Sequence, residues 1–127
     1  MNVLDTSVVL AIINDEAGAI ESRSFLDRSL ISSVSLAEVL QKAAQLGIDP
    51  DEVQKLLGEI EIGTVPFDNA MASSTAALWP LTKHRGLSLA DRACLALAEA
   101  VGGIAVTADR AWADLDLPGI NIHLVTR

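Results

Sequence analysis

Val3-Leu4-Asp5-Thr6-Ser7-Val8-Val9-Leu10 joins two apolar runs through a single acidic residue near the start of the chain. The run before Asp5 predicts a short strand over residues 2–4, and the periodic apolar residues after it predict a helix from Thr6 to about Ile13. Asp5 is therefore expected where a strand passes into a helix.

Three more acids lie at the same kind of junction. Glu38 and Asp91 each come three residues after a serine that begins a helical pattern, and Asp109 follows the strand-like residues 103–107. In a parallel sheet the carboxyl ends of the strands meet at one edge, which is where open α/β folds place their sites. We therefore expect the four acids to form one carboxylate cluster able to hold a divalent cation.

Strand and helix patterns alternate along the rest of the chain. Short strands are predicted over residues 30–32, 60–65, 104–107 and 121–125, and helices over residues 17–28, 36–46, 68–79, 88–100 and 109–114, with one more starting near residue 51. Pro80 is expected to break or kink the helix that approaches it. Five strands separated by helices predict an α/β fold with a parallel sheet covered on both faces.

Length and composition favour one domain with an aliphatic core. A chain of 127 residues can bury about two-thirds of its unfolded surface, and no linker or repeat divides it, so we expect a single domain over residues 1–127. Half of the residues are apolar and only 3% are aromatic, which suits a helix-covered sheet better than a β-sandwich.

Cysteine usage and hydropathy indicate a soluble cytoplasmic protein. The lone cysteine, Cys94, cannot pair within the chain and is expected to be a small buried hydrophobic residue in a reducing compartment. No basic and apolar leader precedes Asp5. The apolar run over residues 8–13 is far shorter than the roughly 18 residues that a membrane helix needs.

The net charge of −8 bears on the partners of the protein. Tight, nonspecific binding to nucleic acids depends on many Lys and Arg contacts to phosphate, so the acidic balance argues against it. A nucleic-acid enzyme is not excluded, because bound Mg²⁺ or Mn²⁺ would cancel part of the local negative charge. The nine basic residues then need only be well placed.

Each acid also has a simple structural interpretation. Ser35 with Glu38, and Ser88 with Asp91, match the capping box, in which a serine and an acid three residues later satisfy backbone N–H groups at a helix start. One such acid alone could be only a cap, whereas four at equivalent junctions favour a shared site. Carboxylate ligands suit Mg²⁺ or Mn²⁺, and the chain lacks the Cys and His spacing of zinc sites.

The four acids lie in four short segments. These are Val3-Leu4-Asp5-Thr6-Ser7, Ser35-Leu36-Ala37-Glu38-Val39, Leu87-Ser88-Leu89-Ala90-Asp91-Arg92-Ala93 and Val106-Thr107-Ala108-Asp109-Arg110-Ala111-Trp112. In this order the segments resemble those of the PIN-domain nucleases, and within them the VapC-type toxins of bacterial and archaeal toxin–antitoxin pairs. The resemblance covers essentially the whole chain.

The resemblance implies a three-layer α/β/α sandwich with a central, mainly parallel five-stranded sheet. It implies a metal-dependent endoribonuclease in which RNA is cut by water that Mg²⁺ or Mn²⁺ activates. Asp5, Glu38 and Asp91 would be the central catalytic and metal-binding acids, and Asp109 would be a fourth and more variable member of the set.

Substrate contacts are expected from polar and basic residues near the acids. Thr6 would contact the substrate and, together with Thr107, orient the carboxylates or bound water. The basic candidates lie next to the acids or shortly before or after them in the sequence: Lys42, Lys83, Arg85, Arg92 and Arg110.

The toxin resemblance also implies protein partners, namely a homodimer and a small antitoxin that docks across the first helices and blocks the acidic pocket. The apolar residues available for a partner helix are equally suited to the core: Leu10, Ile13, Phe25, Leu26 and Leu30. Two alternatives remain open. One is a PIN nuclease that processes RNA without an antitoxin, and the other is a non-catalytic metal-binding interaction module.

Overall fold

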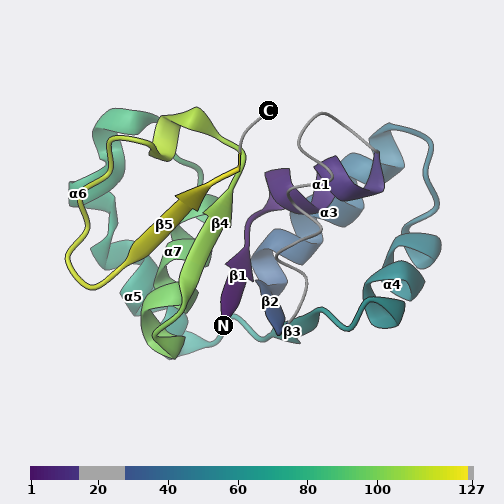
Figure 1. The fold of residues 1–127 in the computed structure, drawn as a ribbon, viewed down its shortest axis with the longest axis horizontal. Coiled ribbons are helices and arrows are strands. Elements are labelled where there is room, and N and C mark those ends of the chain that lie inside the picture. The colour runs from purple at the N-terminus through teal and green to yellow at the C-terminus, as the bar shows by residue number, and fades with distance from the viewer. Residues whose placement is uncertain (15–27, 126–127) are drawn as a thin grey trace.

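Five parallel strands form the centre of the molecule, in the order β3-β2-β1-β4-β5 (Figure 1). The computed structural model describes residues 1–14 and 28–125. The strands are β1 (Asn2–Leu4), β2 (Ser29–Ser32), β3 (Gly63–Val65), β4 (Ile104–Thr107) and β5 (Asn121–Leu124). All four neighbouring pairs are parallel, which confirms the predicted parallel sheet.

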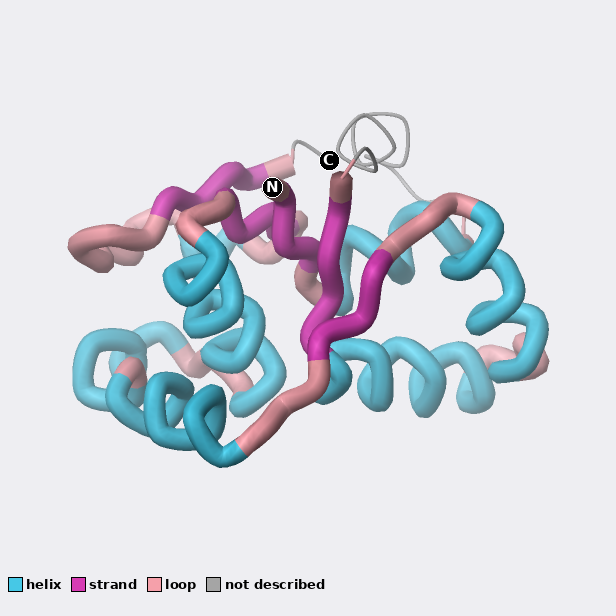
Figure 2. Tube along the Cα trace, turned by 90° about the horizontal axis from the view of Figure 1, so that it is seen from below, coloured by secondary structure: helices cyan, strands magenta, loops and turns pink. Residues whose placement is uncertain are grey.

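Helices cover both faces of this sheet (Figures 1 and 2). One face carries α1 (Thr6–Ile13), α3 (Ser33–Gln45) and α4 (Pro50–Glu59), which pack around one apolar cluster. The other face carries α5 (Asn69–Ala77), α6 (Trp79–Thr82) and α7 (Leu89–Val101), next to a second cluster. The predicted three-layer α/β/α sandwich is therefore confirmed.

The strands supply both clusters because successive side chains point to opposite faces of a sheet. In β1, Val3 packs in the cluster beneath α7 and Leu4 in the cluster beneath α1 and α3. In β4, Ala105 and Val106 divide in the same way. Each of these four side chains is fully buried, as expected for a sheet enclosed between two helical layers.

The predicted helix over residues 88–100 corresponds to α7, which contains more buried residues than any other helix of the described chain. Ser88 and Asp91 form the expected capping box, and Gly102 ends the helix in the left-handed conformation. Cys94 is buried within α7, where desolvation raises the pKa of its thiol well above the usual value. No helix in the described ranges is long and apolar enough to cross a membrane.

The start of α3 differs from the prediction. The helix begins at Ser33 rather than near residue 36, and its N-cap is Ser32, whose side chain accepts a hydrogen bond from the Val34 N–H. Ser35 is therefore a buried residue of the first turn and not the predicted cap. Glu38 therefore does not cap the helix and instead extends from its second turn.

The predicted strand over residues 60–65 is wrong in its first half. Residues 60–62 complete the end of α4, with the Ile60 N–H bonded to Leu56 O and the Ile62 N–H bonded to Leu57 O. Ile62 is buried against the helix, so the apolar alternation reflects helix packing rather than a strand. Only Gly63–Val65 pairs with β2.

Three other predicted elements differ from the structure in extent or lie outside the described residues. The helix over residues 68–79 ends as α5 at Ala77, and a separate α6 follows with Pro80 in its first turn, which agrees with the predicted break at proline. The helix over residues 109–114 is a single 3₁₀ turn, η2 (Arg110–Trp112). The predicted helix over residues 17–28 lies, apart from Arg28, outside the described residues.

Candidate functional site

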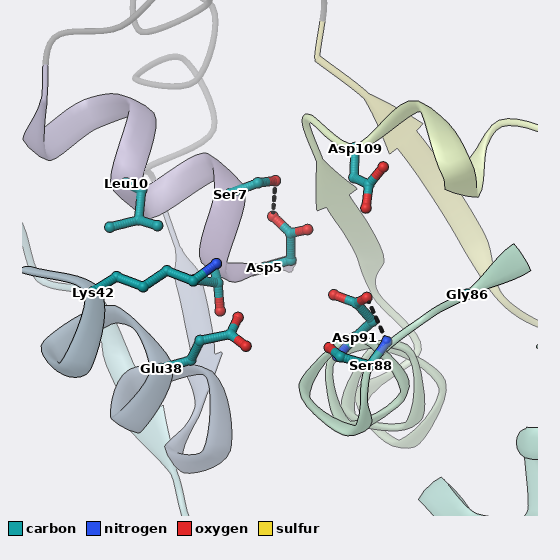
Figure 3. A pocket seen from close by; sticks show the side chains of 10 residues that line it. Asp5, Ser7, Leu10, Glu38, Lys42, Gly86, Ser88, Asp91 and Asp109 are labelled. Carbon is teal, nitrogen blue, oxygen red and sulfur yellow. Dashed lines mark hydrogen bonds between the residues drawn. The ribbon is translucent and has the colours of Figure 1, made fainter. Parts of the chain in front are cut away.

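The four predicted acids line one pocket, although they come from four separate segments. Asp5 follows β1, Glu38 extends from α3, Asp91 lies in the first turn of α7, and Asp109 follows β4. The pocket has a volume of about 410 Å³ and is completed by Thr6, Ser7, Leu10, Lys42, Gly86 and Ser88. In Figure 3 the carboxylates of the four acids turn toward a common space.

Asp5 is the buried centre of this pocket, with 2% of its surface exposed. It caps α1, because its Oδ1 accepts a hydrogen bond from the Val8 N–H at 3.1 Å. The same oxygen accepts a second hydrogen bond, from the Ser7 hydroxyl at 2.6 Å, while Oδ2 accepts one from the Thr107 hydroxyl at 2.6 Å. Oδ1 thus has both lone pairs in use, whereas Oδ2 keeps one for another ligand.

Burial raises the pKa of Asp5 to about 6, from an ordinary value of 3.8. This value is the net result, because hydrogen bonds from Ser7, Thr107 and Val8 lower the pKa while the negative charge of Asp91 adds to its rise. The fold therefore holds a carboxylate in a place where its ionised form is poorly solvated. A positive charge in the pocket would relieve this cost.

Asp91 shares this electrostatic environment. Its Oδ2 accepts a hydrogen bond from the Ser88 N–H at 2.9 Å, and the Ser88 Oγ accepts one from the Asp91 N–H at 3.2 Å. Burial raises the pKa of Asp91, and the charges of Asp109 and Glu38 raise it too, against the lowering effect of Ser88. Asp91 therefore lies in the field of two other acids of the pocket, in addition to its capping role.

Glu38 and Asp109 form the more open sides of the pocket. Glu38 is half-buried on α3, and Asp109 is exposed. Asp109 caps η2, since its Oδ1 accepts a hydrogen bond from the Ala111 N–H at 2.9 Å. Its carboxylate is therefore partly committed to the backbone.

Ser7 is a site residue to which the sequence interpretation assigned no role. Its Oγ accepts a hydrogen bond from the Ala108 N–H at 2.9 Å, so its single proton is directed to Asp5. Thr107 works in the same way, because its Oγ1 accepts from the Asp109 N–H at 3.0 Å and donates to Asp5. The two hydroxyls therefore link Asp5 to the segment that carries Asp109.

Thr6 is buried beside this network and lines the pocket. Its hydroxyl donates a long hydrogen bond, 3.5 Å, to Ser35 O on α3. Its contact with substrate stays a prediction.

The donor chemistry of the pocket fits a hard divalent cation. Carboxylate and hydroxyl oxygens are the ligands that Mg²⁺ takes, and Asp5 Oδ2 offers a free lone pair among them. Within the described ranges, no three His, Cys, Asp or Glu side chains lie close enough to hold an ion together directly. This spacing suits Mg²⁺, which usually keeps several waters and needs only one or two carboxylates in direct contact.

The basic residues named from the sequence occupy different surroundings. Arg85 forms an ion pair with Asp114, and the Lys83 ammonium lies 5.2 Å from the centre of the Trp79 ring. The Arg92 guanidinium donates to Thr82 Oγ1 at 3.0 Å and to Leu87 O at 2.9 Å, so it braces the loop before α7.

Two basic residues lie closer to the acids. Arg110 is exposed and lines a neighbouring pocket with Ser7 and Asp109. Of the five basic candidates, Lys42 alone lines the acidic pocket. Substrate binding by Lys83, Arg85, Arg92 and Arg110 stays a prediction.

The apolar residues proposed to contact a partner helix lie in different parts of the structure. Leu10 lines the acidic pocket and is half-buried. Ile13 and Leu30 pack against the two apolar clusters. Phe25 and Leu26 lie outside the described residues.

Comparisons with known proteins agree with this architecture. The family model of the PIN domain matches residues 3–117. No curated protein matches the chain significantly in sequence.

Three solved structures illustrate the similarity of the fold. A toxin–antitoxin complex from Klebsiella pneumoniae has 18% identity and a TM-score of 0.69, covering 94% of this chain and 95% of its own. DNA-bound VapBC from Salmonella typhimurium has 23% identity and a TM-score of 0.70, covering 98% of both chains. FitAcB from Neisseria gonorrhoeae has 20% identity and a TM-score of 0.66, covering 96% of both. At these identities the similarity establishes a shared fold.

Proposed function

Because the chain belongs to the PIN-domain family, we propose that it is a metal-dependent endoribonuclease and the toxin of a type II toxin–antitoxin pair. The observation that carries the proposal is the convergence of Asp5, Glu38, Asp91 and Asp109 on one pocket around a buried carboxylate. The toxin assignment is supported by structural neighbours that are toxin–antitoxin complexes.

We assign the cation to Asp5 and Asp91, with Glu38 and Asp109 acting through bound water or direct contact. When bound, Mg²⁺ or Mn²⁺ supplies a Lewis acid that lowers the pKa of water and neutralises charge on a phosphodiester. Asp5 would use Oδ2, because its Oδ1 already accepts two hydrogen bonds.

The chain itself contributes position and charge. Ser7 and Thr107 fix the Asp5 carboxylate plane by hydrogen bonds to its two oxygens. The Ser88 cap fixes Asp91 in the same manner at the start of α7. Such prearranged groups need no reorganisation when substrate arrives, which is how positioning lowers an activation barrier.

The partners follow from the toxin assignment. We propose a small antitoxin that covers the acidic pocket from the side of α1, where Leu10 stands at its edge. A homodimer and a cytoplasmic location belong to the same proposal. A purified antitoxin that inhibits RNA cleavage in proportion to complex formation would support it, and cleavage unaffected by saturating antitoxin would contradict it.

RNA cleavage by the purified protein tests the enzymatic proposal. We expect single-stranded RNA to be cut in Mg²⁺ or Mn²⁺, to leave 5′-phosphate ends, and to stay intact when a chelator is present, because the acids alone cannot neutralise the phosphodiester. End-mapping of total RNA measures all three features. Cleavage that persists in the chelator would refute the metal-dependent proposal, whereas metal binding without any cleavage would favour a non-catalytic module.

A further inference from the structure

We propose that Lys42 is a phosphate-anchoring residue, which holds the RNA strand where the acidic pocket opens into a groove between α3 and α7. This inference rests on the proposed ribonuclease function and goes beyond it, because it identifies one basic residue and the direction in which the strand leaves the pocket.

The position of Lys42 on α3 directs it toward the acids. It follows Glu38 by four residues, so the two side chains lie on the same face of the helix. Lys42 lines the acidic pocket together with Asp5 and Asp91. In Figure 3 its ammonium group extends into the space between Asp5 and Glu38.

The charge of Lys42 is also available for a ligand. Among residues 1–14 and 28–125, ion pairing is found between Arg85 and Asp114 and not at Lys42. The Lys42 ammonium therefore has no carboxylate within 4.0 Å in these ranges. Among the other basic candidates, Arg92 braces a loop and Lys83 stands over Trp79, whereas Arg110 lines a neighbouring pocket and not the acidic one. A lysine ammonium has three donors and is a common point-charge ligand of phosphate.

A groove continues from the acidic pocket past Lys42. It has a volume of about 490 Å³ and shares Glu38, Lys42 and Ser88 with that pocket. Its other lining residues come from α3 and from the start of α7: Val34, Ala37, Gln41, Gln45, Leu89 and Ala90. The groove therefore offers amide groups and an exposed leucine, while Lys42 stands at its junction with the acids.

Electrostatics explains why such an anchor is needed. A phosphodiester must approach a pocket lined by four carboxylates, which repel it. A divalent cation compensates only part of this charge, and Lys42 adds a second positive centre on the side from which the groove extends. The next phosphate along the strand is the group that it would hold.

Lys42→Gln tests this assignment, with Lys42→Arg as the charge-preserving variant and Lys55→Gln as a control on the exposed face of α4. We expect Lys42→Gln to raise KM about tenfold and change kcat less than about threefold, as for a lost charge-assisted contact outside the reacting group. Lys42→Arg should restore most of the KM, and Lys55→Gln should match the wild type.

RNA affinity supplies an independent readout. It is measured as Kd for a fluorescent single-stranded RNA over a range of KCl, with every variant in the Asp91→Asn background so that the RNA stays intact. Lys42→Gln should weaken binding about tenfold. It should also make the negative slope of log K against log salt shallower by about 0.7, the value for one phosphate contact on a single strand. Lys55→Gln should change neither quantity.

Three outcomes would overturn the assignment. Unchanged Kd and salt slope in Lys42→Gln, while the wild type cleaves RNA, would remove Lys42 from the binding site and leave the proposed function intact. Unchanged RNA binding combined with tighter Mg²⁺ binding would show that Lys42 only neutralises the acids. A wild type that neither binds nor cleaves RNA would refute the proposed function along with this inference.

Discussion

Asp91→Asn is expected to lower metal-dependent RNA cleavage by at least about a thousandfold while the protein stays folded. The substitution removes a negative charge and one hard oxygen from the pocket. The helix cap should survive, because the asparagine carbonyl oxygen can accept the hydrogen bond that the Ser88 N–H now donates to Asp91 at 2.9 Å. Cleavage rates under single-turnover conditions and thermal unfolding measure the two effects separately.

Asp68→Asn is a matched control for this prediction. Asp68 is also an acid at a helix start, where its Oδ1 accepts a hydrogen bond from the Met71 N–H at 2.9 Å, but it is exposed and does not line the acidic pocket. The Asp68→Asn variant should cleave RNA at the rate of the wild type. If Asp91→Asn retained full activity in Mg²⁺, or if both variants lost activity equally, the carboxylate of Asp91 would have no special role.

The acidic pocket could be predicted from the sequence because strand ends and helix starts are local features. Asp5 and Asp91 stand next to clear apolar periodicity, and parallel topology then brings their elements to one edge. The capping box of Ser88 and Asp91 was equally visible, because it lies within four residues. Local patterns of this kind predict the position of a side chain, even when they leave its partners undefined.

Local patterns did not predict the hydroxyl network around Asp5, and the expected orienting role of Thr107 came only from the family resemblance. Thr107 lies 102 residues from Asp5, and its hydrogen bond depends on the pairing of β1 with β4. The bond from Ser7 to Asp5 is local, because the two residues are only two positions apart. Its second bond, from the Ala108 N–H, again depends on tertiary structure.

The start of α3 was predicted wrongly because two serines compete for the cap. Ser32 and Ser35 are both plausible N-caps by residue type, and the end of β2 at Ser32 decides between them. Ser35 is buried next to Thr6, which donates its hydroxyl hydrogen to the Ser35 carbonyl oxygen. The choice of cap therefore follows from where the sheet ends.

Proximity in sequence was a poor guide to the basic residues. Arg92 directly follows Asp91, but adjacent residues on a helix point in different directions, and Arg92 reaches Thr82 and Leu87 instead of the pocket. Lys42 is four residues from Glu38, which places both on one helix face. Helical spacing was therefore more informative than adjacency.

Asp5→Asn is expected to stabilise the metal-free protein by about 1–2 kcal/mol and to abolish its stabilisation by Mg²⁺ or Mn²⁺. The buried Asp5 carboxylate has a pKa raised to about 6 from 3.8, chiefly by desolvation. A shift of this size corresponds to roughly 3 kcal/mol of unfavourable free energy for the ionised form in the folded state. Asparagine fills the same space without the charge.

The expected gain is smaller than the full penalty because one hydrogen bond is lost. The asparagine carbonyl oxygen can still accept from the Ser7 hydroxyl and the Val8 N–H, which now bond to Oδ1. The amide nitrogen cannot accept the hydrogen bond that Thr107 now donates to Oδ2. Leaving that hydroxyl unpaired costs about 1–2 kcal/mol, which is subtracted from the electrostatic gain.

Thermal unfolding in a chelator and in excess Mg²⁺ measures both parts of the prediction. Without metal, the Tm of Asp5→Asn at pH 8 should exceed that of the wild type by about 4–8 °C. Because the pKa of Asp5 is raised, its charge destabilises the folded wild type fully above about pH 6 and not at all below the unfolded value of 3.8. The difference in Tm should therefore shrink toward about pH 4.

Excess Mg²⁺ should raise the Tm of the wild type and leave the Tm of the variant unchanged. A variant that is less stable than the wild type in the chelator would show that the hydroxyl network outweighs the buried charge, and equal metal stabilisation of both proteins would remove Asp5 from the proposed cation site.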